Sequence, residues 1–375
     1  MDRFASRSFR RRLQIAFSSK VIRLGGLLGA LSLVWACYPA PDVTYSNPQE
    51  LTVSRWMIEY RTGEEKVHLT MRYSRKRDDG SQGFSNNGFT ISPDQLIGLT
   101  REQAMSAGTN VKFQLRRDAG TFNFEGWFKE GNGSGHFPFS PNPSFAADLN
   151  KQGFGTPTAD QQLSMALHDV GFALINELKA QEYEKPTLEQ LVKMGHHGVR
   201  LEYLQGLKSL GYNVKSVYFL IKMKDHGVTL NFIRELAALG YTGLAPEALI
   251  RTRDHGVTPN FINEFMAAGY SRLSLDEWVT LQDHGVSTKF VQELSTLGYS
   301  RLPTEQLRRM RDHGVSTEFI QDLKQLGFNN VPVDTLIRLR DHGVSAKFIQ
   351  RVKEQGQKDL TLEDYIRIRD RGEQY

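Results

Sequence analysis

The chain has 375 residues, of which 39% are hydrophobic and 24% are charged. This composition is typical of globular domains, and the length leaves room for more than one of them. The formal net charge of +5 belongs to the N-terminal segment: residues 1–36 hold seven basic side chains and one acidic one, which leaves 40 basic and 41 acidic side chains of the 47 and 42 in the whole chain. A non-specific polyanion binder needs excess positive charge in its body, so we expect no nucleic acid as partner.

Residues 1–36 are expected to be a signal peptide. A basic start is followed by the largely apolar residues 24–36, which are too few for a transmembrane helix but fit a signal-peptide core. The stretch resembles the signal of bacterial lipoproteins, with Val34 and Ala36 before Cys37, the only cysteine of the chain. The resemblance implies lipid attachment at Cys37 and an exported protein of the periplasm or cell envelope that is anchored to the membrane. An ordinary cleaved signal and an uncleaved N-terminal anchor are the alternatives.

A tether and a β domain are expected next. Residues 37–50 contain three prolines, which favour an extended, semi-rigid spacer. Apolar and polar residues alternate within 51–145, and the alternation predicts a small antiparallel β-rich domain. In this domain we expect a short helix near 92–99 and a glycine-rich hairpin turn at 130–135. Residues 146–166 are expected to form a connecting helix.

A four-residue motif recurs with a constant 29-residue period through the rest of the chain, 167–375. It reads Asp-His-Gly-Val in five places, and weaker copies at 167–170, 196–199 and 370–372 keep the same phase. A fixed period of this length is the signature of a repeat array, here of seven units. We assign a structural role to the motif residues Asp225, His226, Gly227, Asp254, His255, Gly256, Asp283, His284, Gly285, Asp312, His313, Gly314, Asp341, His342 and Gly343.

Each unit is predicted to be a helical hairpin. Thr229 suits the N-cap of a first helix, whose apolar residues Val228, Phe232 and Leu236 are spaced for one face, and Gly240 suits its end. A capping-box pattern at 274–277 and similar signals elsewhere predict the second helix. One hairpin cannot bury its apolar faces alone, so the units must stack. We therefore expect an α+β multidomain protein, in which the small antiparallel β domain precedes an all-α solenoid of seven 29-residue hairpins.

The Asp-His motifs allow two interpretations. Both side chains bind zinc, so metal or small-ligand sensing is the alternative function. Zinc needs about four ligands at about 2.0–2.3 Å, however, and hairpins about 10 Å apart offer one His and one Asp each. We favour the structural interpretation, in which the Asp accepts hydrogen bonds from N–H groups of the following helix or from a neighbouring Arg, and one His ring nitrogen bonds to the backbone.

Pairs of basic residues precede the motifs in most units. Cations suit the last turn of a helix, and a stripe of them also suits an anionic partner. We take as the candidate interaction surface Lys222, Lys224, Arg251, Arg253, Arg309, Arg311, Arg338 and Arg340.

The sequence contains none of the short motifs that indicate an enzyme. HExxH, GxSxG and CxxC are absent, and no Lys-Ser/Thr follows the glycines of 131–135. We expect no catalysis, cofactor or metal.

The repeats resemble tandem 29-residue helical repeats of exported bacterial proteins. Similar repeats, and a segment like 118–126 with 135–137, occur behind the peptidase domain of some penicillin-sensor-type antirepressor metallopeptidases. The resemblance covers about 110–369 and lacks the peptidase, so it implies a sensing or interaction module. We expect a non-catalytic scaffold of the cell envelope that binds another protein or an envelope component.

Overall fold

The computed structural model describes residues 53–60, 65–76, 82–271, 273–357 and 359–372. The predicted signal peptide, Cys37 and the tether lie outside the described residues. Those that are described belong to one compact unit. None of the helices in the described ranges has the length and hydropathy that crossing a bilayer requires.

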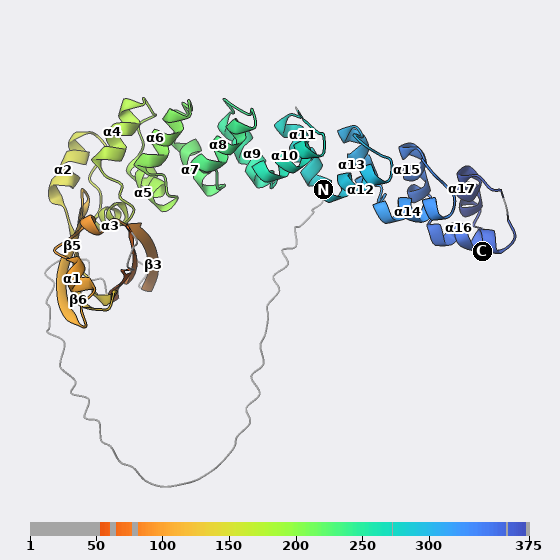
Figure 1. Ribbon diagram of the computed structural model, residues 1–375. Coiled ribbons are helices and arrows are strands. Elements are labelled where there is room, and N and C mark those ends of the chain that lie inside the picture. Colours follow the sequence, from red (N-terminus) through yellow and green to blue (C-terminus); the bar gives the residue numbers. More distant parts are fainter. Residues whose placement is uncertain (1–52, 61–64, 77–81, 272, 358, 373–375) are drawn as a thin grey trace, which may run out of the picture. The chain divides into compact units, whose positions relative to one another are not determined.

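An antiparallel, curled sheet forms the first part of the described chain (Figure 1). Its strands follow the order β3-β2-β1-β7-β6-β5-β4, and β8 pairs with β6. Where a short helix near 92–99 was expected, the structure has η1 (Pro93–Gln95) followed by a two-residue strand, and the short helix α1 (Arg101–Ala104) lies beyond that range. The strands are β1 (Val53–Glu59), β2 (Val67–Lys76), β3 (Gln82–Ile91), β4 (Leu96–Ile97), β5 (Thr109–Arg117), β6 (Gly120–Lys129), β7 (Asn132–His136) and β8 (Phe139–Pro141).

Trp56 lies at the centre of the β-domain core. Its ring packs against Phe113 at 5.1 Å between centroids, and its Nε1 donates to the carbonyl of Glu125 at 3.1 Å. A Cβ atom on Gly126 or Gly135 would lie 2.7 Å from the indole ring. The expected turn at 130–135 was therefore wrong in extent, because only its first two residues turn and the following glycines belong to β7, where they leave room for the core.

Sixteen helices form pairs α2–α3 through α16–α17 in the described part of the chain (Figure 1). Each begins one 29-residue repeat after its counterpart in the preceding pair. The first helices are α2 (Pro143–Lys151), α4 (Phe172–Ala180), α6 (Leu201–Ser209), α8 (Leu230–Ala238), α10 (Pro259–Ala267), α12 (Thr288–Thr296), α14 (Thr317–Gln325) and α16 (Ala346–Glu354). The second helices are α3 (Ala159–Leu167), α5 (Leu188–His196), α7 (Val217–Asp225), α9 (Pro246–Asp254), α11 (Leu275–Asp283), α13 (Thr304–Asp312), α15 (Val333–Asp341) and α17 (Leu362–Asp370).

The array contains one more pair than the seven units that the motif indicated. Where residues 146–166 were expected to form a single connecting helix, the structure has the end of α2 and most of α3, which keep the 29-residue phase. Thr158 and Gln161 form a capping box at the start of α3, as Thr187 and Gln190 do in α5. Helix α3 ends at the weak copy of the motif at 167–170, so the motif marks the end of a unit and not its beginning, and a count of units that begins at residue 167 omits the first pair.

Local sequence explains where each helix begins and ends. In α8, the Thr229 Oγ1 accepts a hydrogen bond from the Phe232 N–H at 3.1 Å. Gly240 takes φ 93°, and the Tyr241 N–H then donates to the Leu236 carbonyl at 3.0 Å. First helices contact first helices of the next pair, and second helices contact second helices. The predicted stack of hairpins is thus confirmed.

The sheet packs directly on the first helical pairs. Helix α3 contacts β6 and β8, and Arg117 forms an ion pair with Asp169 at 3.2 Å. Helix α4 has Gly171 at its N-cap, which has no side chain to accept a bond. Asp118 supplies the missing cap from the β domain, because its Oδ2 accepts a hydrogen bond from the Phe172 N–H at 2.7 Å. The β domain therefore caps a helix of the array.

Candidate functional site

The Asp-His-Gly motif forms the end of the second helix in the five pairs that contain it. Asp225 is the last residue of α7, His226 is its C-cap, and Gly227 has φ 69°. The Val228 N–H then donates to the Met223 carbonyl at 2.8 Å, and the Val228 side chain is fully buried. Only the glycine and valine are explained by helix termination.

The aspartate and histidine join successive units. The His255 Nδ1 donates to the Asp283 Oδ1 at 2.7 Å, 28 residues later. Since a carboxylate can only accept, the Nδ1 atom carries the proton. The same bond links His197 to Asp225, His226 to Asp254 (2.5 Å), His284 to Asp312 (2.5 Å), His313 to Asp341 (2.6 Å) and His342 to Asp370 (2.7 Å).

The expected partners of these two residues were mostly wrong. Within the described ranges, neither backbone N–H groups nor backbone carbonyls pair with these side chains, because they meet each other across the boundary between two units. Asp312 also accepts from Arg308 at 2.7 Å, so the expected Arg partner occurs in this one place within the described residues. Each joint brings together one His and one Asp, and no group of three or more metal-binding side chains converges in the described part of the chain.

The second residue of each basic pair lies on an aromatic ring. The Arg253 Cζ is 5.0 Å from the centroid of Phe232 on the first helix of its own pair. In the pair that has Gln282 instead, the corresponding Phe261 packs edge-on against Trp278. The other examples are Lys224 on Tyr203 (5.0 Å), Arg311 on Phe290 (5.2 Å), Arg340 on Phe319 (5.2 Å) and Arg369 on Phe348 (5.3 Å).

In three of the basic pairs, the first residue contacts an acidic residue of the next second helix. Arg338 makes two bonds, at 2.6 and 2.8 Å, to the carboxylate of Glu363. Arg251 and Asp276 are 2.6 Å apart, and Arg309 and Asp334 are 2.8 Å apart. Lys222 lies over the ring of Tyr218.

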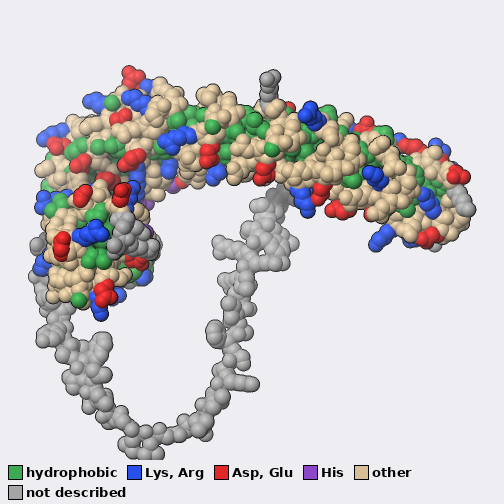
Figure 2. Space-filling view, viewed as in Figure 1, with side chains coloured by type: hydrophobic (Ala, Val, Ile, Leu, Met, Phe, Trp, Pro, Cys, Tyr) green, Lys and Arg blue, Asp and Glu red, His purple; other side chains and the backbone are tan. Residues whose placement is uncertain are grey.

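All eight residues of the candidate interaction surface therefore have partners inside the chain. Figure 2 shows basic and acidic side chains interspersed along the visible face of the helices. A partner would meet a mixed surface there, and not a continuous basic stripe.

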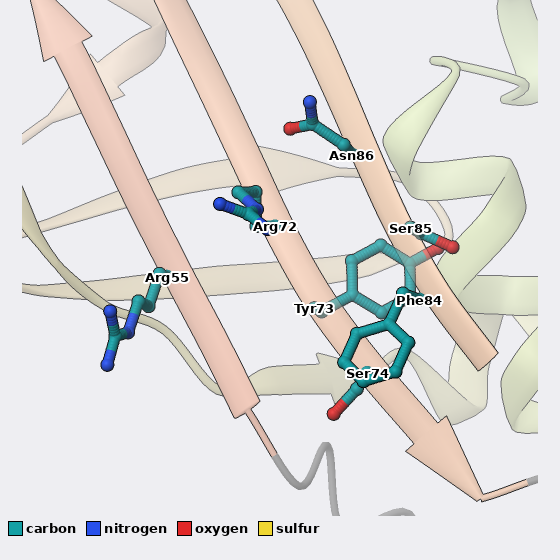
Figure 3. A pocket seen from close by; sticks show the side chains of 7 residues that line it. All are labelled: Arg55, Arg72, Tyr73, Ser74, Phe84, Ser85 and Asn86. Carbon is teal, nitrogen blue, oxygen red and sulfur yellow. The ribbon is translucent and has the colours of Figure 1, made fainter. Parts of the chain in front are cut away.

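A hollow of about 210 Å³ on β1, β2 and β3 was not anticipated from the sequence. Figure 3 shows Arg55, Arg72 and Asn86 on these three neighbouring strands, where they are also neighbours in register. Neither arginine has a partner among the described residues, although like charges opposite each other are unfavourable. Phe84 beside them is 74% exposed. Two unpaired guanidinium groups favour an anionic group, and only the strand register could have revealed their proximity.

Comparisons with protein families, with curated proteins and with solved structures gave no match. The resemblance to repeats of antirepressor-type proteins therefore stays an expectation.

Proposed function

We propose that the chain is a non-catalytic, exported scaffold of the bacterial cell envelope, whose helical pairs bind another protein or an envelope component. The observation that supports this best is the series of six His–Asp bonds between successive units. In these bonds the His and Asp side chains, which could otherwise bind a metal or ligand, are paired with each other. The bonds connect each hairpin to the next. Such a succession presents an extended surface, which is how repeat proteins bind their partners.

Tyr218 marks a position on this surface that is suited to a partner. It occupies the second position of α7, and the other seven second helices have Asp or Glu there. Its side chain is 56% exposed, and its ring lies below the Lys222 ammonium at 5.7 Å. Exposed tyrosines are enriched among the residues that dominate protein–protein binding. We propose that the face around Tyr218 contacts the partner.

Photo-crosslinking in cells tests this function. The full chain carries a photoreactive residue at position 218 or, as a matched control, at Glu305, which occupies the same position in α13. We expect one discrete adduct from position 218 and a weaker one or none from position 305. The variant Tyr218→Glu, which restores the acidic pattern of the other units, should reduce capture from a neighbouring photoreactive position. Equal, diffuse labelling from both positions would contradict a scaffold that uses this face.

A further inference from the structure

The outer side of β1, β2 and β3 carries charged and apolar side chains that the proposed function does not use. Successive side chains of a strand point to opposite sides of a sheet, so the buried Trp56 and Ile58 alternate with exposed residues of β1. The same alternation holds along β2, where Arg72 lies between the buried Met71 and Tyr73. We define the β1–β3 face by five exposed side chains of these strands: Arg55, Met57, Arg72, Phe84 and Asn86.

The two arginines of this face lie opposite each other without a counter-charge. They are partners in the register of β1 and β2, which places their Cβ atoms about 5 Å apart. Within the described ranges, the acidic side chains on this side of the sheet are engaged or distant. Glu125 is 2.8 Å from the Lys112 Nζ, and Glu59 is four residues from Arg55 along β1, about 13 Å at 3.3 Å per residue. An anion from outside the chain would offset the repulsion between the arginines.

The hollow beside the arginines suits a phosphate group. Both arginines line it together with Asn86, which is the register partner of Arg72 (Figure 3). The oxygens of a phosphate point in different directions, so one group can reach guanidinium forks that come from two neighbouring strands. The two oxygens of a carboxylate lie in one plane and match a single fork. The Asn86 amide adds a further donor.

Two large apolar side chains flank the arginines on the same side of the sheet. Phe84 is 74% exposed and Met57 is 55% exposed. Met57 is two residues from Arg55 on β1, and its register partner on β2 is the small Thr70. A free phosphate would leave both apolar side chains in water. A phospholipid presents its phosphate next to apolar chains, so it matches the charged and the apolar parts of the face together.

The start of the sheet is close in sequence to the proposed lipid anchor. Residues 38–52 separate Cys37 from Val53, the first residue of β1. At about 3.3 Å per residue even a fully extended segment of this length spans at most about 50 Å. An anchored chain therefore keeps β1 within that distance of the bilayer. This step rests on the proposed envelope location, whereas the arginines, the hollow and the apolar side chains do not.

We propose that the β1–β3 face contacts the surface of an anionic phospholipid bilayer. Arg55, Arg72 and Asn86 bind the phosphate of one headgroup in the hollow, and Phe84 and Met57 lie against its acyl chains. Because the arginines are exposed, their attraction for the headgroup is screened by salt, and lipid binding weakens as the ionic strength rises.

Dihexanoyl phosphatidylglycerol, a short-chain anionic phospholipid, is the probe for the test. It is titrated into the full chain with methyl-labelled Met, and the signal of Met57 is identified with the variant Met57→Leu. We expect a saturable shift at Met57 that Arg55→Gln and Arg72→Gln each weaken about tenfold, since the lost bonds go to a charged group. The matched control is Arg116→Gln, because Arg116 is exposed on β5 and its Nε is bonded to Gln114. It should leave the affinity unchanged. Dihexanoyl phosphatidylcholine, whose cationic group offsets the phosphate, should bind more weakly.

Melting temperatures and inorganic phosphate complete the test. Removing one of two facing like charges should not lower the melting temperature, so weaker binding by the arginine variants cannot be ascribed to unfolding. Phe84→Ser should weaken the binding of phosphatidylglycerol and leave that of inorganic phosphate unchanged. Equal affinity for inorganic phosphate and phosphatidylglycerol would overturn the membrane contact. No saturable shift at Met57, or an unchanged affinity of both arginine variants, would overturn the whole proposal. None of these outcomes depends on crosslinking from position 218, so the proposed function is tested separately.

Discussion

His168 differs from the later histidines because of a single neighbouring residue. It stands one repeat before His197, and its neighbour in the following unit is His196, where the later units have an aspartate. The two imidazole rings lie 4.9 Å apart between centroids, and the ring of Phe89 in the sheet lies 6.3 Å from that of His168. Burial, and to a lesser extent the charges of His196 and Arg200, lower the pKa of His168 to about 4.

This depressed pKa predicts a loss of stability in mild acid. The pKa of an unfolded histidine is about 6.5, so between about pH 6.5 and about pH 4 the unfolded chain binds more protons at His168 than the folded chain does. Stability must therefore fall as the pH falls through that window. The variant His196→Asp supplies the carboxylate found in the later units and should make the stability depend less on pH. Melting temperatures of both proteins at pH 7.5, 6.0 and 5.0 measure it, and parallel pH profiles would refute this account.

At the scale of the elements, the His–Asp bonds act between neighbouring second helices. In the pair of His255 and Asp283, the two side chains are 39% and 42% exposed, so solvent screens their attraction. Asp283 also faces the negative end of the α11 dipole, which opposes its charge. The His–Asp bond offsets this unfavourable interaction with the helix dipole. Its net contribution to the free energy of unfolding is therefore smaller than the short distance alone indicates.

A double-mutant cycle isolates this contribution. Asp283→Ala, His255→Ala and the double variant should give a coupling free energy of up to about 1 kcal/mol, the range measured for exposed pairs. Urea unfolding near pH 6 is the measurement. Asp322→Ala on α14 is the control, since this exposed carboxylate has no ion-pair partner within the described residues. Strictly additive effects at positions 255 and 283 would show that the bond stabilises nothing.

The elements could be predicted from the sequence wherever one local signal decides them. Thr229 and Gly240 bound α8 as expected, because capping depends on a few adjacent residues. The signals failed where a distant group decides the structure. The local sequence predicts that Gly135 belongs to a turn, whereas in the structure it lies in a strand and leaves the space beside it to the Trp56 ring. The acceptor of His255 lies 28 residues away, and only the three-dimensional stacking of the units brings the two side chains together.

At the scale of the whole molecule, the constant spacing makes the array divisible into equivalent units, so that one unit can be removed without changing the phase of the others. Every described pair begins one repeat length after the pair before it, and each pair contacts its neighbours through equivalent helices. The sequence predicted this period but gave no sign that the β domain takes part in it. Asp118 caps α4 and Arg117 pairs with Asp169, so the sheet forms one end of the stack. The distribution of charge alone could not reveal these contacts.

A whole-unit deletion tests this divisibility. Removing residues 259–287 joins the N-cap Thr258 to Thr288, the first residue of α12, and places Asp312 at the same spacing from His255 that Asp283 now has. We expect a cooperative, folded protein with unchanged helicity per residue and a slightly lower melting temperature, because one interface between neighbours is lost. Removing 259–273 alone deletes α10 and leaves α11 without its hairpin partner, so helicity and cooperativity should fall. Circular dichroism compares the two. Equal behaviour would mean that the repeat phase does not govern stacking, since only the longer deletion preserves it.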